Sequence, residues 1–396
     1  MVSNPQNPLQ SLQQGHWFKL ICGASFQHLP AVRNLALAYT LAGADCIDIA
    51  ADRAVIAAVK AGLQAAAYLA PEAQKRGFLS TTHPTEFTPW LMVSFNDGED
   101  PHFRKATFNP TVCPQDCWRP CEKICPTKAI TFSPEKTAFS GVKPETCYGC
   151  GRCIPICPIQ NITTNSFTAS PDTIAPLVIT SEIDAIEIHT QVGHLTEFQQ
   201  LWHTISPWIN QLQAIAISCP DHQNLIEYLW QIHNIISPTQ KTIIWQTDGR
   251  PMSGDIGDGT THATIKLSQK VLAAKLPGYV QLAGGTNNYT VTKLNQLKML
   301  KTSEKYISKN HKTQPILNHH PQPPEKSYIS GIAYGSYARI LLAETLEKLE
   351  KITIEKTPQN QHNNNIQYPS LKLENVPEIL WEAVSLAHTL VKQIKS

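Results

Sequence analysis

The sequence lacks any cluster of basic residues interleaved with aromatics. Its 33 Lys and Arg nearly balance its 31 Asp and Glu, for a formal net charge of +2. Domains that bind nucleic acid normally carry a basic patch or stripe. We therefore expect no nucleic-acid partner.

Long apolar runs are also missing. The apolar stretch at residues 57–69 is interrupted by Lys60 and Gln64, whereas a helix that spans a bilayer needs about 20 predominantly apolar residues. The first residues contain no apolar segment of the kind found in secretory signals. These absences predict that the chain has no membrane span and is cytoplasmic.

One cysteine pattern is absent, although cysteine itself is abundant. No three cysteines have the C-x₃-C-x₂-C spacing that enzymes using S-adenosylmethionine for radical chemistry show, which argues against that class. The chain has 11 cysteines, and eight of them lie within residues 113–157. Cytosolic thiols stay reduced, so this crowding predicts metal ligation rather than disulfides.

The second cysteine run is CYGCGRCIPICP, at residues 147–158. Its spacing, C-x₂-C-x₂-C-x₃-C-P, is that of two-cluster ferredoxins, in which the fourth cysteine binds the other cluster. A structural zinc site would also accept four cysteines, but usually as two pairs separated by a longer loop. Three close cysteines and a final Cys-Pro favour a [4Fe–4S] cluster.

The first run, CPQDCWRPCEKICP at residues 113–126, has a cysteine at every fourth position. An uninterrupted helix would place all four on one face, but Pro114 and Pro120 argue against such a helix. We interpret the run as a ferredoxin half with a looser loop, flanked like the second run by a short strand (AITFSP and NITTNSF). The predicted ligands are Cys113, Cys117, Cys121 and Cys157 for one cluster, and Cys147, Cys150, Cys153 and Cys125 for the other.

Eight apolar segments outside the cysteine region predict strands, and each is followed by a stretch of helical length. They are residues 18–25, 45–50, 89–95, 185–190, 212–218, 241–247, 279–285 and 328–335. Repeated β–α units predict a parallel sheet, and eight of them predict a closed (β/α)₈ barrel. The alternative is an open doubly wound sheet. We expect a barrel made of residues 1–105 and 166–350, a ferredoxin-like insertion at 106–165, and a polar insert with a C-terminal helix at 351–396.

Glycine-rich segments follow the last strands of the predicted barrel, where such folds often bind phosphate. Gly284 and Gly285 follow the seventh strand, and Gly335, Ser336 and Arg339 follow the eighth. They could bind a flavin or another phosphate-bearing ligand, or the glycines could simply form tight turns. For Cys22, Cys46 and Cys219 we expect buried, inert side chains. His189, which ends the fourth strand, could be either a ligand contact or a structural residue.

Several segments resemble the cyanobacterial light-dependent period protein A family: FKLICGAS, DCIDIAADRAVIAAVKAGL, both cysteine runs, DGRPMSGDIGDGTTHA and YVQLAGGTNNYTV. The resemblance implies iron–sulfur clusters and a role in conveying redox state to the circadian clock. It also implies clock proteins as partners, including an input histidine kinase.

Two functions remain open. The chain is either a redox sensor and electron carrier with an electron-transfer partner, or a barrel oxidoreductase that receives electrons from its ferredoxin insert.

Overall fold

The structure is a computed structural model of the 396-residue chain. The structure describes residues 7–22, 29–79, 88–98, 104–125, 128–133, 139–143, 147, 153–166, 182–249, 259–301, 328–355 and 371–395.

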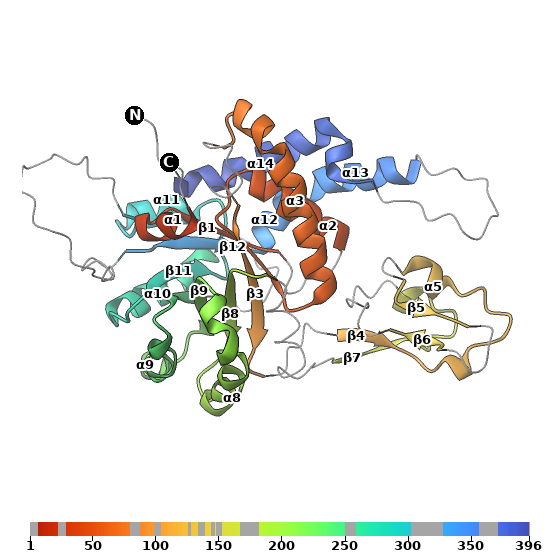
Figure 1. Ribbon diagram of the computed structural model, residues 1–396, viewed down its shortest axis with the longest axis horizontal. Helices are drawn as coiled ribbons and strands as arrows, with labels where there is room; N and C mark the ends of the chain where they lie inside the picture. The colour runs from red at the N-terminus through yellow and green to blue at the C-terminus, as the bar shows by residue number, and fades with distance from the viewer. Residues whose placement is uncertain are drawn as a thin grey trace, which may run out of the picture.

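A closed barrel of eight parallel strands forms the body of the molecule (Figure 1). Around the barrel the order is β1-β12-β11-β10-β9-β8-β3-β2. The strands are β1 (Trp17–Ile21), β2 (Cys46–Ala50), β3 (Trp90–Asn96), β8 (Ala185–His189), β9 (Ala214–Pro220), β10 (Thr242–Asp248), β11 (Tyr279–Ala283) and β12 (Gly331–Tyr334). All eight predicted strands are present, and the closed barrel is confirmed over the open sheet.

Helices surround these strands (Figure 1). Those that follow a barrel strand directly are α2 (Leu29–Leu41), α3 (Arg53–Lys75), α8 (Leu195–Ile205), α9 (Leu225–Ile236), α10 (Thr261–Ala273), α11 (Thr290–Gln296) and α12 (Ser336–Leu341). Three more are α1 (Pro8–Gln14), α13 (Ala343–Glu355) and α14 (Pro377–Lys395), and the 3₁₀ turns in this part are η2 (Ser206–Gln211), η3 (Ser237–Thr239) and η4 (Leu373–Asn375).

Side chains alternate between the two faces of each strand, as the pleat requires. The outward set is apolar and packs beneath the helices, as Ile47, Ile186 and Ile217 do. Near the amino-terminal end, the inward set closes the barrel with Trp17, Trp90 and small residues, packed against Leu12 of α1. Above this layer, the inward positions include the polar side chains of Lys19, Asp48, Glu187, Gln246 and Gln281.

Helix α3 begins after an N-cap residue, Asp52, whose carboxylate accepts hydrogen bonds from the backbone N–H groups of Ala54 (2.8 Å) and Val55 (3.2 Å). Among the described residues, α3 is the one helix long and apolar enough to cross a membrane by length and composition, which we had not expected. In this fold it packs along α2. A Cβ at Gly62 would lie only 2.6 Å from the Arg33 carbonyl oxygen, so the two backbones meet closely. Its packing is that of a barrel helix.

The chain's C-terminal helix is part of the same body. Helix α14 packs against α2, and the Lys395 ammonium lies 2.5 Å from the Asp45 carboxylate just before β2. The predicted helix at the end of the chain is therefore present. The polar insert at 356–367 lies outside the described residues.

The cysteine region is inserted between β3 and β8. Its elements are β4 (Arg104–Thr107), η1 (Pro110–Val112), α5 (Pro120–Ile124), β5 (Ile130–Thr131), β6 (Gly141–Val142), α6 (Cys153–Ile156) and β7 (Thr163–Ser166). Strand β4 pairs antiparallel with β7, and β5 with β6. Figure 1 shows this insert projecting beside the barrel. At its root, the Lys105 ammonium lies 3.7 Å from Asp52, at the barrel end where β2 leads into α3.

Candidate functional site

The cysteine insert is an internal repeat. Each half contains a strand, a cysteine run with a short helix, and a second strand. After each run the chain makes the same turn: Lys128 and Gln160, each three residues beyond the final cysteine, have φ values of 53° and 52°. In both turns the backbone N–H donates to that cysteine's carbonyl oxygen, at 3.2 and 3.1 Å. The two runs are therefore equivalent despite their different spacing.

The prolines break the first run, as predicted. Pro120 stands at the first position of α5, where its missing N–H costs nothing. The preceding residue, Arg119, has a φ of 55°, so no helix extends back toward Cys117. Cys121 and Cys125 consequently occupy the same places at α5 as Cys153 and Cys157 do at α6.

Cysteines from both runs share one small core. Cys121, Cys147, Cys153 and Cys157 are buried there with Ile130 and Ile162, and Cys125 packs against them. Burial raises the pKa of the Cys121 thiol, and the nearby Cys157 and Cys113 raise it further. The last cysteine of the second run, Cys157, thus shares a buried core with Cys121 of the first run.

The donor set of the insert consists of thiols. Ten cysteines in the described residues are free thiols, including seven of the eight predicted ligands; Cys150 lies outside the described residues. In the same part of the chain, no three His, Cys, Asp or Glu side chains converge closely enough to hold one metal ion. A [4Fe–4S] cluster instead takes its four thiolates at separate corners of a cube. The residues present fit such clusters, and the individual ligand assignments stay predictions.

The glycine-rich turns lie at the carboxyl-terminal mouth of the barrel. Gly284 and Gly285 follow β11 with φ values of 60° and 91°. The Gly285 carbonyl oxygen accepts hydrogen bonds from the hydroxyls of Thr260 (2.9 Å) and Thr261 (3.3 Å). These contacts account for the two glycines as a braced turn, so a phosphate contact here stays a prediction.

Gly335, Ser336 and Arg339 lie beside that turn. The Thr286 hydroxyl donates to the Ala333 carbonyl oxygen (2.7 Å), which joins the β11 loop to the end of β12. Helix α12 starts at Ser336 and turns the Arg339 guanidinium back over the end of β1. This helix has only six residues, so its N-terminus is a weak anion site by itself, and Arg339 is the strongest polar group of the set.

The sequence analysis missed a buried charged network inside the barrel. The Lys19 ammonium of β1 lies 2.9 Å from the Asp48 carboxylate of β2 and bonds to the Glu187 carboxylate of β8. All three side chains are fully buried or nearly so. They occupy inward-facing positions of strands whose other residues are mostly apolar. Since alternate residues of a strand face the same side, a charged residue at such a position is the signal that could have revealed them.

Amide side chains extend this network across the barrel. Gln246 Nε2 donates to Glu187 Oε1 (2.5 Å), Gln281 Nε2 to Gln246 Oε1 (2.5 Å), and Trp17 Nε1 to Gln281 Oε1 (2.5 Å). Parallel (β/α)₈ barrels usually fill this space with Val, Ile and Leu. A polar chain of this length in a barrel interior is therefore a candidate functional feature.

His189 connects the network to the mouth. Its Nε2 lies 3.0 Å from Glu187 Oε1, and its side chain is 31% exposed. Burial would lower the pKa of His189, but Glu187 outweighs it and raises the pKa to about 9. Burial also raises the pKa of Glu187, but Lys19 and His189 outweigh this effect and lower that pKa to about 2. For Asp48 the effect of burial is larger than that of Lys19, and it raises the pKa to about 6. At neutral pH the network holds Lys19 and His189 as cations.

The raised pKa of His189 predicts a pH-dependent stability. Its contribution is fully present below the unfolded value of 6.5 and is lost as pH rises through about 9. We expect wild type to lose up to about 3 kcal/mol relative to His189→Asn over this interval. Urea unfolding of both proteins from pH 6 to 10 measures this difference, and a constant difference would show that His189 is neutral in the folded protein.

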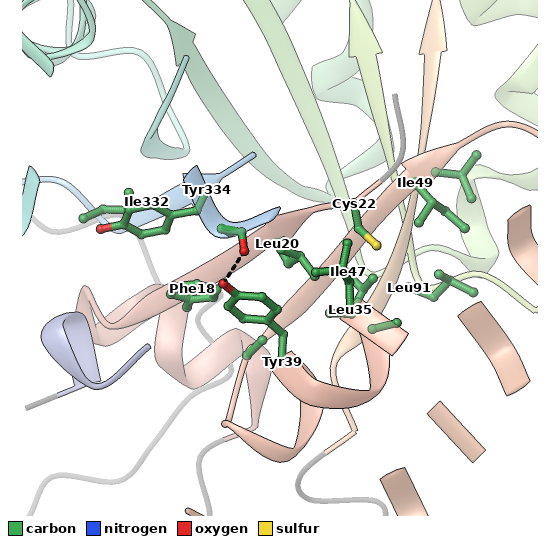
Figure 2. Close-up of a cluster of buried hydrophobic side chains, with 14 of the residues drawn as sticks. Phe18, Leu20, Cys22, Leu35, Tyr39, Ile47, Ile49, Leu91, Ile332 and Tyr334 are labelled. Atoms are coloured by element: carbon green, nitrogen blue, oxygen red, sulfur yellow. Dashed lines mark hydrogen bonds between the residues drawn. The ribbon is translucent and has the colours of Figure 1, made fainter. Parts of the chain in front are cut away.

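The remaining cysteines are core residues, as predicted. Cys22 lies among Leu20, Ile47 and Ile49 (Figure 2), and its thiol donates to the Val32 carbonyl oxygen at 3.4 Å. Burial raises the pKa values of Cys22 and Cys219 to about 12. Cys46 packs inside the barrel beside Trp17 and Trp90. None of the three has the lowered pKa of a reactive thiol.

Comparisons with known proteins agree with this geometry. Residues 113–168 match the family described as the LdpA Fe-S cluster-binding domain, and residues 177–393 match the light dependent period A C-terminal domain. A curated relative, light dependent period A from Synechococcus elongatus, is 48% identical over 388 residues, which covers 98% of this chain and 94% of that protein. The chain therefore belongs to the light dependent period A family and contains its iron–sulfur cluster-binding domain.

Proposed function

We propose that the protein is a cytoplasmic iron–sulfur redox sensor and electron carrier, with two [4Fe–4S] clusters, that conveys cellular redox state to the circadian clock. The observation that carries the proposal is the meeting of both cysteine runs in one small core, with Cys121 beside Cys157. Two clusters held so closely would supply one-electron chemistry and rapid passage between them. Membership of the light dependent period A family connects this chemistry to a clock.

The chain's own groups would tune these clusters. The Ala129 backbone N–H donates to Cys125 Sγ (3.2 Å), and Asn161 Nδ2 lies 3.7 Å from Cys113 Sγ. Hydrogen bonds to cysteine sulfur disperse its negative charge, so they favour the reduced cluster and raise its reduction potential. Both sulfurs belong to the first run, but the predicted ligand sets assign Cys113 to one cluster and Cys125 to the other, so each cluster would be adjusted separately.

The insert also offers a surface for a partner. Trp118, within the first run, is 60% exposed, and the Lys123 ammonium lies 5.3 Å from the centre of its ring. Val112 is 58% exposed nearby in the chain. An exposed Trp beside a cation is the kind of group that anchors protein interfaces. Clock proteins, including an input histidine kinase, are the partners that the family suggests, and an electron donor or acceptor could use the same face.

The first test is the metal content. Protein purified anaerobically should contain about eight iron and eight sulfide per chain, the sum of two cubes. Iron and acid-labile sulfide assays measure these amounts, with Cys22→Ala as a control that alters a cysteine outside the insert. Stoichiometric zinc without sulfide would contradict the proposal.

A second candidate function is suggested by the polar interior of the barrel. A flavin- or phosphometabolite-binding oxidoreductase, supplied with electrons by the insert, would need such groups near a ligand. The absorbance spectrum of the same anaerobic protein separates the two functions. Flavin bands on top of the broad cluster absorption would favour the enzyme.

A further inference from the structure

Two cationic side chains, Arg339 and His189, lie at the mouth of the barrel on opposite sides. His189 is the last residue of β8, and Arg339 belongs to α12, which starts directly after β12. In the strand order, three strands separate β8 from β12 in either direction. Ligands of parallel barrels bind at the carboxyl ends of the strands. Both residues are therefore placed to contact one ligand that extends across the mouth.

Arg339 has more hydrogen-bond donors than it has partners among the residues that the structure describes. Its Nη1 donates to the Ile21 carbonyl oxygen and its Nη2 to the Ser336 hydroxyl, both at 3.1 Å. A guanidinium group has five N–H donors, and no carboxylate contacts this one within the part of the chain that the structure describes. Arginine is almost never fully buried without a partner, and Arg339 is partly buried. An anion from outside the chain would supply such a partner.

The position of Arg339 is fixed by its surroundings. The Tyr39 hydroxyl donates to the Ala338 carbonyl oxygen at 2.8 Å, as the dashed line in Figure 2 marks, so α2 holds α12 in place. Tyr39 is itself fully buried and stacks on Phe18. A guanidinium held in this way loses little freedom when it binds an anion, because its orientation is set beforehand.

His189 presents the second polar contact. Its Nε2 is bonded to Glu187, which is held in turn by Lys19 and Gln246. Its Nδ1 has no hydrogen-bond partner among the residues that the structure describes, and its side chain remains partly exposed. The inward residues around it are short, including Ser94 and Ser218. The imidazole is therefore oriented from below and free to donate a proton or a hydrogen bond above.

We propose that the barrel mouth binds a small organic anion, whose phosphate or carboxylate group contacts Arg339 and whose other end receives a hydrogen bond from His189. The buried charged network beneath the mouth supports this assignment, because apolar side chains in the same space would cost the fold less stability than buried charges do. The site would be present whether the barrel is an enzyme or a binding module. It does not depend on the iron–sulfur function.

Inorganic phosphate and succinate are suitable probes, since one is a phosphate and the other a carboxylate, the two anionic groups that the proposal allows. Cluster-replete wild-type protein should bind at least one of them in isothermal titration at constant ionic strength, with chloride as the reference. Arg339→Gln should weaken that binding about 10- to 100-fold, because charge-assisted hydrogen bonds are lost. His189→Asn should weaken succinate, whose second carboxylate can accept a hydrogen bond from the imidazole, more than phosphate.

Arg76→Gln is the matched control, because Arg76 is a surface arginine that lies over Trp381, away from the mouth. It should bind the probes as wild type does. If Arg339→Gln does not fold by circular dichroism, Arg339→Lys takes its place and should still bind more weakly, since lysine cannot form the fork. Failure of wild type to bind either probe, or equal binding by wild type and the Arg339 variant, would overturn the proposal.

Discussion

Cys121→Ser and Cys157→Ser should abolish the same iron–sulfur cluster, although these residues belong to different runs. Each variant should retain about four iron per chain, one cube of two, and the same paramagnetic signal should disappear from the reduced protein. The structural reason is that Cys157 lies close enough to Cys121 to affect its pKa, as does Cys113. Cys125→Ser should instead remove the signal that Cys147→Ser removes.

The control for these four variants is again Cys22→Ala, because Cys22 is buried in the apolar core outside the insert. It should keep both signals. If Cys125→Ser and Cys121→Ser remove one signal and Cys157→Ser removes the other, each run binds its own cluster. The equivalent turns at Lys128 and Gln160 would then show that the two halves repeat in structure, although neither run supplies a ligand to the other run's cluster.

The sequence predicts which residues bind the clusters but not how those residues are arranged. Spacing identified the ligand types and the final Cys-Pro of each run, because those depend on local geometry. The looser first loop left it open whether Cys125 folds back. The two halves are brought together by the antiparallel pairing of β4 with β7 and of β5 with β6. The β4–β7 pairing joins segments about 60 residues apart, which is a tertiary property that spacing does not encode.

The barrel shows a different limit. Apolar runs predicted all eight strands, since each strand buries one face beneath the helices. Lys19 and Glu187 were overlooked because a single charged residue in an apolar run gives little signal by itself. That Lys19 and Glu187 belong to one network is seen only from the strand register, which aligns the inward positions of neighbouring strands and places Ser94 opposite Glu187. Single residues then become a network.

From their place after the last strands, the glycine-rich turns were interpreted either as a phosphate site or as tight turns. Gly284 and Gly285 do need glycine, because both have positive φ values. Thr260 and Thr261 are nevertheless bonded to the Gly285 carbonyl oxygen, which sequence reasoning could not anticipate across 24 residues. Among the residues predicted for that site, the unpaired donors of Arg339 make the stronger case for a ligand.

Lys19→Met should destabilise the barrel by about 3–5 kcal/mol, the cost of removing one partner from a buried ion pair. Lys19 is fully buried, and Asp48 and Glu187 raise its pKa against the effect of burial. Methionine has nearly the same length but leaves Asp48 without its cation and Glu187 with His189 alone. Urea unfolding followed by fluorescence suits this test, because Trp17 and Trp90 lie directly below the network.

Lys270→Met is the matched control, because Lys270 forms an exposed ion pair with Asp221 at 2.8 Å. It should cost less than about 1 kcal/mol. The triple variant Lys19→Met, Asp48→Asn, Glu187→Gln should recover part of the loss, since it no longer buries unpaired charges. If Lys19→Met is as mild as the control, the two carboxyls take up protons in the folded protein. The network would then be neutral at the centre, and His189 would lose the charged Glu187 that keeps it a cation at the mouth.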